Sequence, residues 1–173
     1  METRSVVLYL YLTKLLGNRW ERFQYDLSVR KEVQKTVYFL QEKFNISFDY
    51  TYNLYIYGPY SQSLSKEAFA LSNDPNSAEI SQNNELKDCS ANKIGGLKAL
   101  FYDGDTPDLD KMELAATAHF LYNYTFASGT PEERKAKCAD HIKMIKPHFS
   151  INDITTSFDF LVQKELLDAT RAR

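Results

Sequence analysis

The amino-acid sequence predicts a mainly α fold (helix-rich α+β), a single-domain bundle of six or seven helices with one or two short strands, over residues 1–173. Three observations lead to this prediction. Apolar residues recur at helical spacing in most of the chain. Two Thr-Pro pairs, at positions 106 and 130, have the composition of helix starts. A single stretch, 48–57, alternates as a strand does.

The N-terminal third of the chain predicts two helices. Residues 4–16 are apolar nearly all round and stop at Gly17, which predicts a buried helix with this glycine just past its end. Ser28 is expected to cap a second helix over 29–44. Its apolar stripe is Val29, Val33, Val37, Leu40 and Phe44, and its opposite side carries Arg30, Lys31, Lys35 and Lys43.

A strand followed by a rigid corner is predicted next. The strand over 48–57 places alternate residues on one face, namely Phe48, Tyr50, Tyr52, Leu54 and Ile56. Gly58-Pro59 is expected to stop it, because proline has no N–H to give a sheet. Ser61 would then cap a helix whose inner face is Leu64, Ala68 and Leu71. The nearest short candidate for a pairing strand is Ala78–Ser81.

The second half of the chain reads as a polar segment followed by helices. Residues 72–91 are rich in Asn, Ser and Asp, which predicts a long polar loop within the domain. Residues 92–102 have helical spacing interrupted by Gly95-Gly96. Three further helices are expected: 107–124 capped by Thr106, 131–145 opened by a capping box of Thr130 and Glu133, and 151–169 capped by Ser150.

The composition narrows the classes of protein to which this chain could belong. The net charge of −2 and the pI of about 5.9 argue against a general nucleic-acid-coating protein. Aromatic residues make up 14% of the chain, with twelve tyrosines, and tyrosine is enriched at protein interfaces. The apolar run 6–12 is too short to span a membrane, and it lacks the cleavage site of a signal peptide. The two cysteines form no CxxC motif. A cytoplasmic location is expected.

The familiar catalytic and metal patterns are absent from the sequence. The three histidines lack ligand spacing, and four nearby aspartates lack the order of a calcium loop; these residues are His119, His141, His148, Asp103, Asp105, Asp108 and Asp110. There is no nucleophile elbow and no phosphate-cradling loop. The sequence therefore predicts no enzyme, no metal and no cofactor. A pocket or enzyme near His119 is the weakest alternative.

Two motifs resemble a known family. The first is a helical K-x-x-Y-x-x-Q pattern and the second is a Y-G-P-Y-S corner, formed here by Lys35, Tyr38, Gln41, Tyr57, Gly58, Pro59, Tyr60 and Ser61. The order of features over 3–165 resembles the YwgA-like proteins and, more distantly, the Panacea (SocA-like, antitoxin-associated) domain. That resemblance implies protein binding, either to neutralise a toxin or as an adaptor. The polar stretch 73–91 departs from the leucine-rich continuation common in the family.

The functional prediction is a non-catalytic protein-interaction module, antitoxin- or adaptor-like, whose partner is another protein. The expected partner-binding residues are Tyr55, Tyr57, Gly58, Pro59, Tyr60 and Ser61. Tyrosines around an ordered corner present a large contact area at low entropic cost. The alternative is a nucleic-acid-binding regulator with a winged-helix-like portion, which would use Arg30, Lys31 and Lys35.

Overall fold

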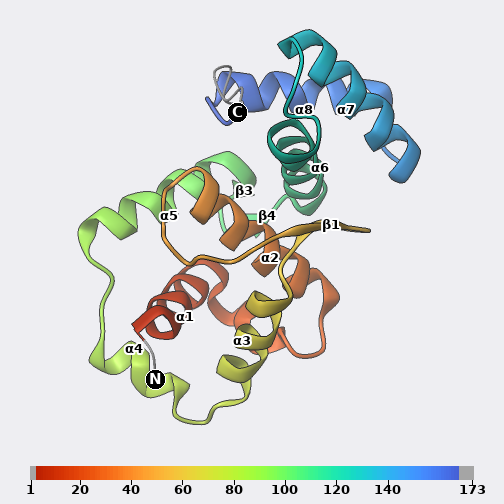
Figure 1. The fold of residues 1–173 in the computed structure, drawn as a ribbon. Helices are drawn as coiled ribbons and strands as arrows, with labels where there is room; N and C mark the ends of the chain where they lie inside the picture. Colours follow the sequence, from red (N-terminus) through yellow and green to blue (C-terminus); the bar gives the residue numbers. More distant parts are fainter. Residues whose placement is uncertain (1–2, 168–173) are drawn as a thin grey trace. The chain divides into compact units, whose positions relative to one another are not determined.

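The computed structural model describes residues 3–167 and confirms the predicted fold class (Figure 1). The chain is mainly helical, with two short two-stranded antiparallel sheets. It divides into two compact units. Unit 1 comprises the chain up to Asn53 together with Tyr60–Leu109, and unit 2 comprises Leu54–Pro59 and the chain from Asp110 onward.

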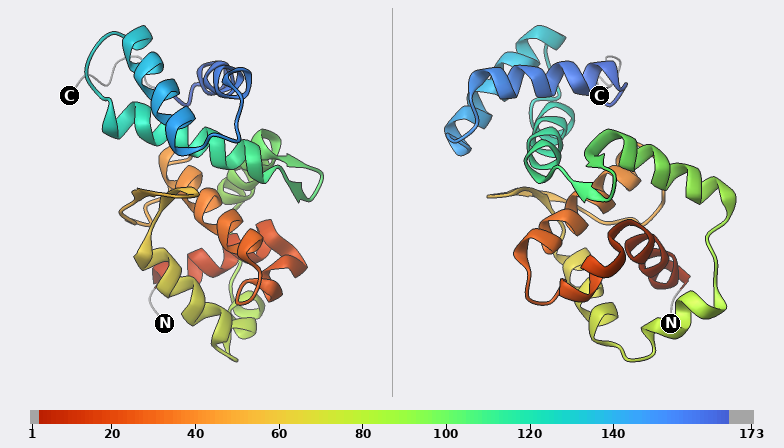
Figure 2. Two further views of the ribbon diagram at one scale, coloured as in Figure 1. Left: turned by 90° about the vertical axis from the view of Figure 1, so that its right-hand side faces the viewer. Right: turned by 180° about the vertical axis from the view of Figure 1, so that it is seen from behind.

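Unit 1 is built around its first helix. Its elements are α1 (Thr3–Leu16), the 3₁₀ helix η1 (Gly17–Arg22), α2 (Leu27–Glu42), α3 (Gln62–Asn73), α4 (Ser77–Asn83), α5 (Asp88–Phe101), β3 (Tyr102–Asp103) and β4 (Thr106–Pro107). Helix α1 contacts η1, α3, α4 and α5 (Figure 2). The predicted buried helix is confirmed, since Leu8 and Leu12 are fully buried. Gly17 follows it with a φ of 54°.

Unit 2 contains the remaining helices and the tip of a hairpin. The hairpin is β1 (Asn53–Tyr55) with β2 (Gly58–Tyr60), and the helices are α6 (Leu109–Phe120), the π-helix η2 (Leu121–Thr125), α7 (Pro131–Ile145) and α8 (Ile151–Gln163). Helices α7 and α8 lie side by side (Figures 1 and 2). Their shared core includes Cys138, Ile142, Ile154 and Leu161, which are all fully buried.

The capping boxes of α7 and α8 fix where these helices start. Thr130 Oγ1 accepts from the backbone N–H of Glu133 at 3.2 Å, and Glu133 Oε2 accepts from the N–H of Thr130 at 3.0 Å. Ser150 and Asp153 form the same arrangement. The bonds from the Ser150 hydroxyl and backbone N–H lower the pKa of the Asp153 carboxyl. The predicted starts of both helices are confirmed.

Two other predicted helix starts are wrong. Asp26, not Ser28, caps α2, because Asp26 Oδ1 accepts from the N–H of Ser28 at 2.9 Å. Thr106 does not cap α6 but pairs in β4 with β3 across the Gly104-Asp105 turn, and α6 begins at Leu109. Gly104 takes a φ of 58°, which suits it to such a tight turn.

One predicted helix changes type before its end, and one predicted helix end is wrong. The α-helix expected over 107–124 stops at Phe120 and continues as the π-helix η2. The helix expected to reach 169 ends at Gln163, because Glu165 takes a left-handed φ of 54°. The N–H of Leu166 then bonds the Leu161 carbonyl at 2.8 Å, as in a Schellman end. Position 169 itself lies outside the described residues.

The long loop predicted over 72–91 is replaced by α4 and the start of α5. A few buried groups are enough to hold α4 in place. Ile80 is 8% exposed, and the buried Ser77 hydroxyl donates to the Leu71 carbonyl at 2.7 Å. Ala78–Ser81 is therefore helical, and the partner of β1 is β2 instead.

Helix α5 runs unbroken through its two glycines, and each has a different environment. A Cβ on Gly96 would lie 2.8 Å from Phe44 Cε1, whereas a Cβ on Gly95 would meet nothing within 4 Å. We expect Gly95→Ala to raise the free energy of unfolding by about 0.5–1 kcal/mol, because alanine restricts the unfolded chain. Gly96→Ala should gain less or lose stability, because the Phe44 ring must move. Urea unfolding of both variants checks this, and equal stabilisation would contradict it.

Candidate functional site

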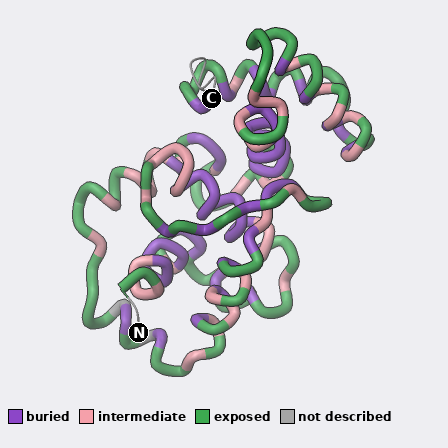
Figure 3. The backbone as a smooth tube through the Cα atoms, viewed as in Figure 1, coloured by how far each residue is buried: buried purple, intermediate pink, exposed green. Residues whose placement is uncertain are grey.

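A hairpin tip formed by Tyr55, Ile56 and Tyr57 is the candidate partner-binding site. Strands β1 and β2 are joined by a two-residue turn at Ile56-Tyr57. The three side chains are 56%, 75% and 41% exposed, although all are large and apolar or aromatic. Figure 3 shows the end of this hairpin as exposed. Three consecutive side chains of this kind form an apolar projection into solvent.

The predicted corner is partly wrong. Gly58-Pro59 does not stop the strand but begins β2, because the chain has already turned at Ile56-Tyr57. Gly58 has a φ of 87°, which favours glycine. Among the predicted binding residues, Tyr55 and Tyr57 are exposed, Tyr60 is half-buried, and Gly58, Pro59 and Ser61 are buried. Ile56 was expected on the buried strand face, and its place in the turn puts it in solvent instead.

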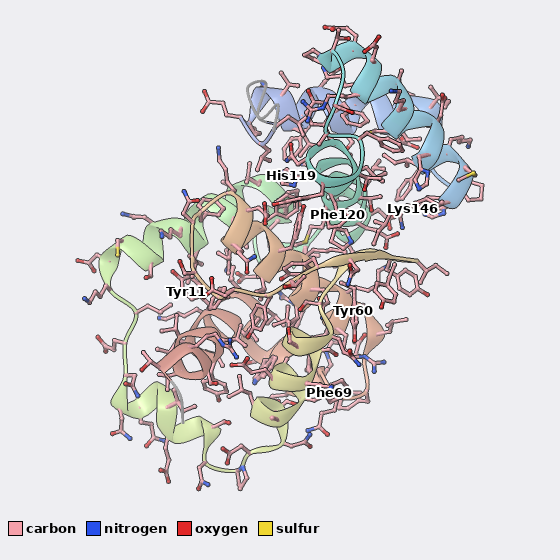
Figure 4. All side chains as sticks on the ribbon, viewed as in Figure 1. Tyr11, Tyr60, Phe69, His119, Phe120 and Lys146 are labelled. Carbon is pink, nitrogen blue, oxygen red and sulfur yellow. The ribbon has the colours of Figure 1, made fainter. Side chains whose placement is uncertain are left out.

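A buried lysine holds the backbone of the hairpin tip. Lys146 Nζ donates to the Ile56 carbonyl at 2.6 Å and to Glu113 Oε1 at 2.6 Å. Lys146 follows α7 (Figure 4), and Glu113 lies on α6. Their side chains are 1% and 4% exposed, so this is a buried ion pair. In the sequence, Lys146 stands just past the helix predicted over 131–145, and nothing in its pattern marks this lysine as buried.

A glutamine of α2 holds the chain where β2 ends. Gln34 Nε2 donates to the Ser61 carbonyl at 3.0 Å, and the Ser61 N–H donates to Gln34 Oε1 at 2.9 Å. Both residues belong to unit 1 and are buried. Ser61 also caps α3 as predicted, since its Oγ accepts from the N–H of Leu64. One amide side chain thus takes the role of a strand partner at the hairpin's end.

A second glutamine, two turns further along α2, repeats this arrangement. Gln41 Nε2 donates to the Tyr50 carbonyl, and Gln41 Oε1 accepts from the Tyr50 N–H, both at 3.0 Å. Tyr52 packs edge-on against Tyr38, with ring centroids 5.0 Å apart. The segment predicted as the first half of the strand belongs to no sheet, and Asp49 within it takes a left-handed φ of 58°. The Gln41 side chain satisfies the backbone of Tyr50 in place of a neighbouring strand.

The residues of the nucleic-acid alternative do not gather into one exposed patch. Lys35 is 2% exposed. Arg30 is half-buried, with its guanidinium 6.0 Å from the centre of the Phe69 ring. Lys31 is also half-buried. The buried position of Lys35 contradicts its predicted place on a solvent-facing basic side of the helix, and this geometry does not favour phosphate binding.

In the described part of the chain, the histidine, cysteine and acidic side chains considered as catalytic or metal-binding residues do not gather into a site. His119 is buried, and its Nε2 lies 2.9 Å from Asn123 Nδ2. Burial raises the pKa of the Cys138 thiol to about 12, whereas Cys89 is exposed. Among residues 3–167, no three His, Cys, Asp or Glu side chains gather so as to hold a metal ion. No helix in this range has the length and apolar character needed to cross a membrane.

Comparison with known proteins gives no relative for this chain. A scan against protein-family models, a search of curated proteins and a search of solved structures each found no match. The resemblance to the YwgA-like and Panacea proteins stays a prediction.

Proposed function

We propose that this chain is a non-catalytic protein-interaction module that binds a partner protein through the hairpin tip. The observation that supports this most is the exposure of Tyr55, Ile56 and Tyr57 on a backbone held by the buried Lys146. Tyrosine is enriched at protein interfaces because it combines a large apolar surface with a hydroxyl that can form hydrogen bonds. An exposed apolar projection of this kind is typical of a surface that another protein covers.

The rigidity of the hairpin tip favours binding. A loop that must become ordered on association loses conformational entropy, which reduces affinity. Here the Ile56 carbonyl is fixed by a buried donor before any partner arrives. Fully burying a large apolar side chain contributes about 1.5–3 kcal/mol. The three side chains of the hairpin tip are 41–75% exposed, so covering them would supply part of the driving force for a specific contact.

An antitoxin-like or adaptor-like role is the form of this proposal that the family resemblance supports. Both roles require a surface that recognises another protein and no reactive group. The motif positions Tyr57 and Gly58 form part of the turn and the start of β2, and Gln41 bonds the Tyr50 backbone. The motif residues therefore contribute to presenting the hairpin tip or to the scaffold of unit 1.

Site-specific photo-crosslinking in the native host tests the proposal. Benzoylphenylalanine would replace Tyr55 or Tyr57, and in a matched control it would replace Tyr25, which is 73% exposed in unit 1. We expect irradiation to give one discrete protein adduct from positions 55 and 57 and none from position 25. The double variant Tyr55→Ser/Tyr57→Ser should lower recovery of that protein at least tenfold in a pull-down, while Tyr25→Ser should not.

Two outcomes would count against the proposal. The first is the absence of any adduct from both hairpin positions in folded protein. The second is the same set of adducts from positions 25, 55 and 57, which would show only that exposed aromatic residues meet their surroundings at random.

A further inference from the structure

A pocket of about 410 Å³ lies in unit 1 and shares no lining residue with the hairpin tip. It is formed by the last turn of α1, the start of η1, one residue of α5 and one residue of the β3–β4 turn. The lining residues are Lys14, Leu15, Leu16, Gly17, Asn18, Arg19, Lys98 and Asp105. The volume is in the range of small-molecule sites.

The lining of this pocket is rich in positive charge. Lys14, Arg19 and Lys98 face a single acidic lining residue, Asp105. The Lys14 side chain makes no hydrogen bond or ion pair with any residue that the structure describes. The pocket therefore has more cationic donors than its own residues satisfy.

The buried carboxylate of Glu32 holds Arg19 in position. Its Nε and Nη2 donate to Glu32 at 3.2 and 2.8 Å, and Nη2 also lies 3.3 Å from the Leu15 carbonyl. Glu32 is 1% exposed and accepts a further bond from the Tyr102 hydroxyl at 2.9 Å. Burial, together with the Glu32 charge, raises the pKa of Tyr102, which keeps this hydroxyl a donor.

One nitrogen of the Arg19 guanidinium is left for a ligand. Nη1 makes no hydrogen bond to any residue that the structure describes, although Nε and Nη2 are both engaged. The side chain is 22% exposed and lines the pocket. A guanidinium fixed on one side and open on the other loses little entropy when it binds an anion.

The Asp105 carboxylate is itself an oxyanion bound by the cations of the pocket. Lys98 Nζ donates to Asp105 Oδ1 at 2.6 Å, while the aspartate side chain is 84% exposed on its turn. The bond and charge of Lys98, and then the charge of Arg19, lower the pKa of the Asp105 carboxyl. An exposed pair of this kind is weak, so another anion can displace the aspartate.

We propose that this pocket binds a small ligand through an oxyanion group, a phosphate or a carboxylate, held by Lys14, Arg19 and Lys98, and that Asp105 occupies the same position when the ligand is absent. Phosphate and carboxylate share the oxygen acceptors that lysine and arginine recognise. The proposal does not depend on the hairpin tip.

Titration of the full chain with inorganic phosphate and, separately, with acetate tests this proposal. Nuclear magnetic resonance would follow the backbone amides of Gly17 and Asn18, which line the pocket, at constant ionic strength. We expect saturable shifts with at least one of the two anions. The anion that saturates at the lower concentration identifies the preferred group.

Variants with opposite expected effects separate a site from general charge. Asp105→Asn should tighten binding at least threefold, because it removes the internal competitor, and Lys98→Ala should weaken it about tenfold. Lys14→Ala should weaken binding severalfold. Two controls match these changes in charge at exposed positions elsewhere, and they are Lys66→Ala on α3 and Asp159→Asn on α8. Neither control should alter the affinity.

Three results would overturn the oxyanion site. The shifts could grow linearly with concentration for both anions. Asp105→Asn could leave the affinity unchanged or reduce it. Lys66→Ala could weaken binding as much as Lys14→Ala does. The first and third results would show that the anions respond only to overall charge, and the second would show that Asp105 does not compete with a bound anion. None of them would affect the proposed role of the hairpin tip.

Discussion

Replacing Lys146 with methionine is expected to lower the free energy of unfolding by about 3–5 kcal/mol. The reason is the burial of Glu113, whose side chain is 4% exposed and would lose the ammonium 2.6 Å away. The Ile56 carbonyl would lose its donor as well. Such a loss is a large part of the stability of a typical domain. Urea unfolding followed by circular dichroism measures it.

The double variant Lys146→Met/Glu113→Met is the matched control. It removes the buried carboxylate together with the ammonium and keeps side chains of similar size, so we expect it to recover more than half of the loss. Only the cost of the Ile56 carbonyl should remain, about 1 kcal/mol, because its bond is part-buried and water can replace part of it. A double variant as unstable as Lys146→Met alone would show that the charge of Glu113 is not the cause.

Replacing Gln34 with methionine is expected to lower the free energy of unfolding by about 2–4 kcal/mol. The side chain satisfies both the N–H and the carbonyl of Ser61, and Ser61 is fully buried. Methionine has nearly the same length but offers neither a donor nor a strong acceptor. Leaving a buried backbone group without a partner costs about 1–3 kcal/mol. The substitution should also speed hydrogen exchange at the Ser61 amide by more than it does at the amides of α1.

Two further glutamines provide graded controls for Gln34. Gln41→Met removes the same pair of bonds from Tyr50, but Gln41 is only half-buried, so water can replace part of them and the loss should be smaller. Gln62→Met changes an exposed residue at the start of α3 and should cost less than about 0.5 kcal/mol. An equal loss in all three variants would contradict the role assigned to Gln34.

Local sequence signals predicted the helices well where the signal is a short-range hydrogen bond. The box of Thr130 and Glu133 closes within one turn, so it forms the same way in any fold that contains it. Ser61 and Ser150 cap their helices for the same reason. The signals failed where a competing local structure was available. Thr106-Pro107 has the composition of a helix start, yet it pairs with Tyr102–Asp103 instead.

The candidate site was predicted only in part, because exposure depends on where the chain turns. The alternation around Tyr55 and Tyr57 is real, but a turn two residues earlier than expected moved Ile56 from the buried face into solvent. A shift of this size changes which residues face a partner. Lys35 shows the opposite error, since a lysine expected in solvent is buried.

The sequence by itself determined the helical class, the capped starts of α3, α7 and α8, and the tyrosine-rich stretch that leads to the hairpin, because each depends on residues within a few positions of one another. Only the tertiary structure decided that Gln34 and Gln41 replace strand partners, that Lys146 holds the Ile56 carbonyl, and that Lys14, Arg19 and Lys98 line one pocket. The hydrogen-bonded pairs among these groups are separated by 9 to 90 positions in the chain. Their contacts arise from packing, which no local pattern encodes.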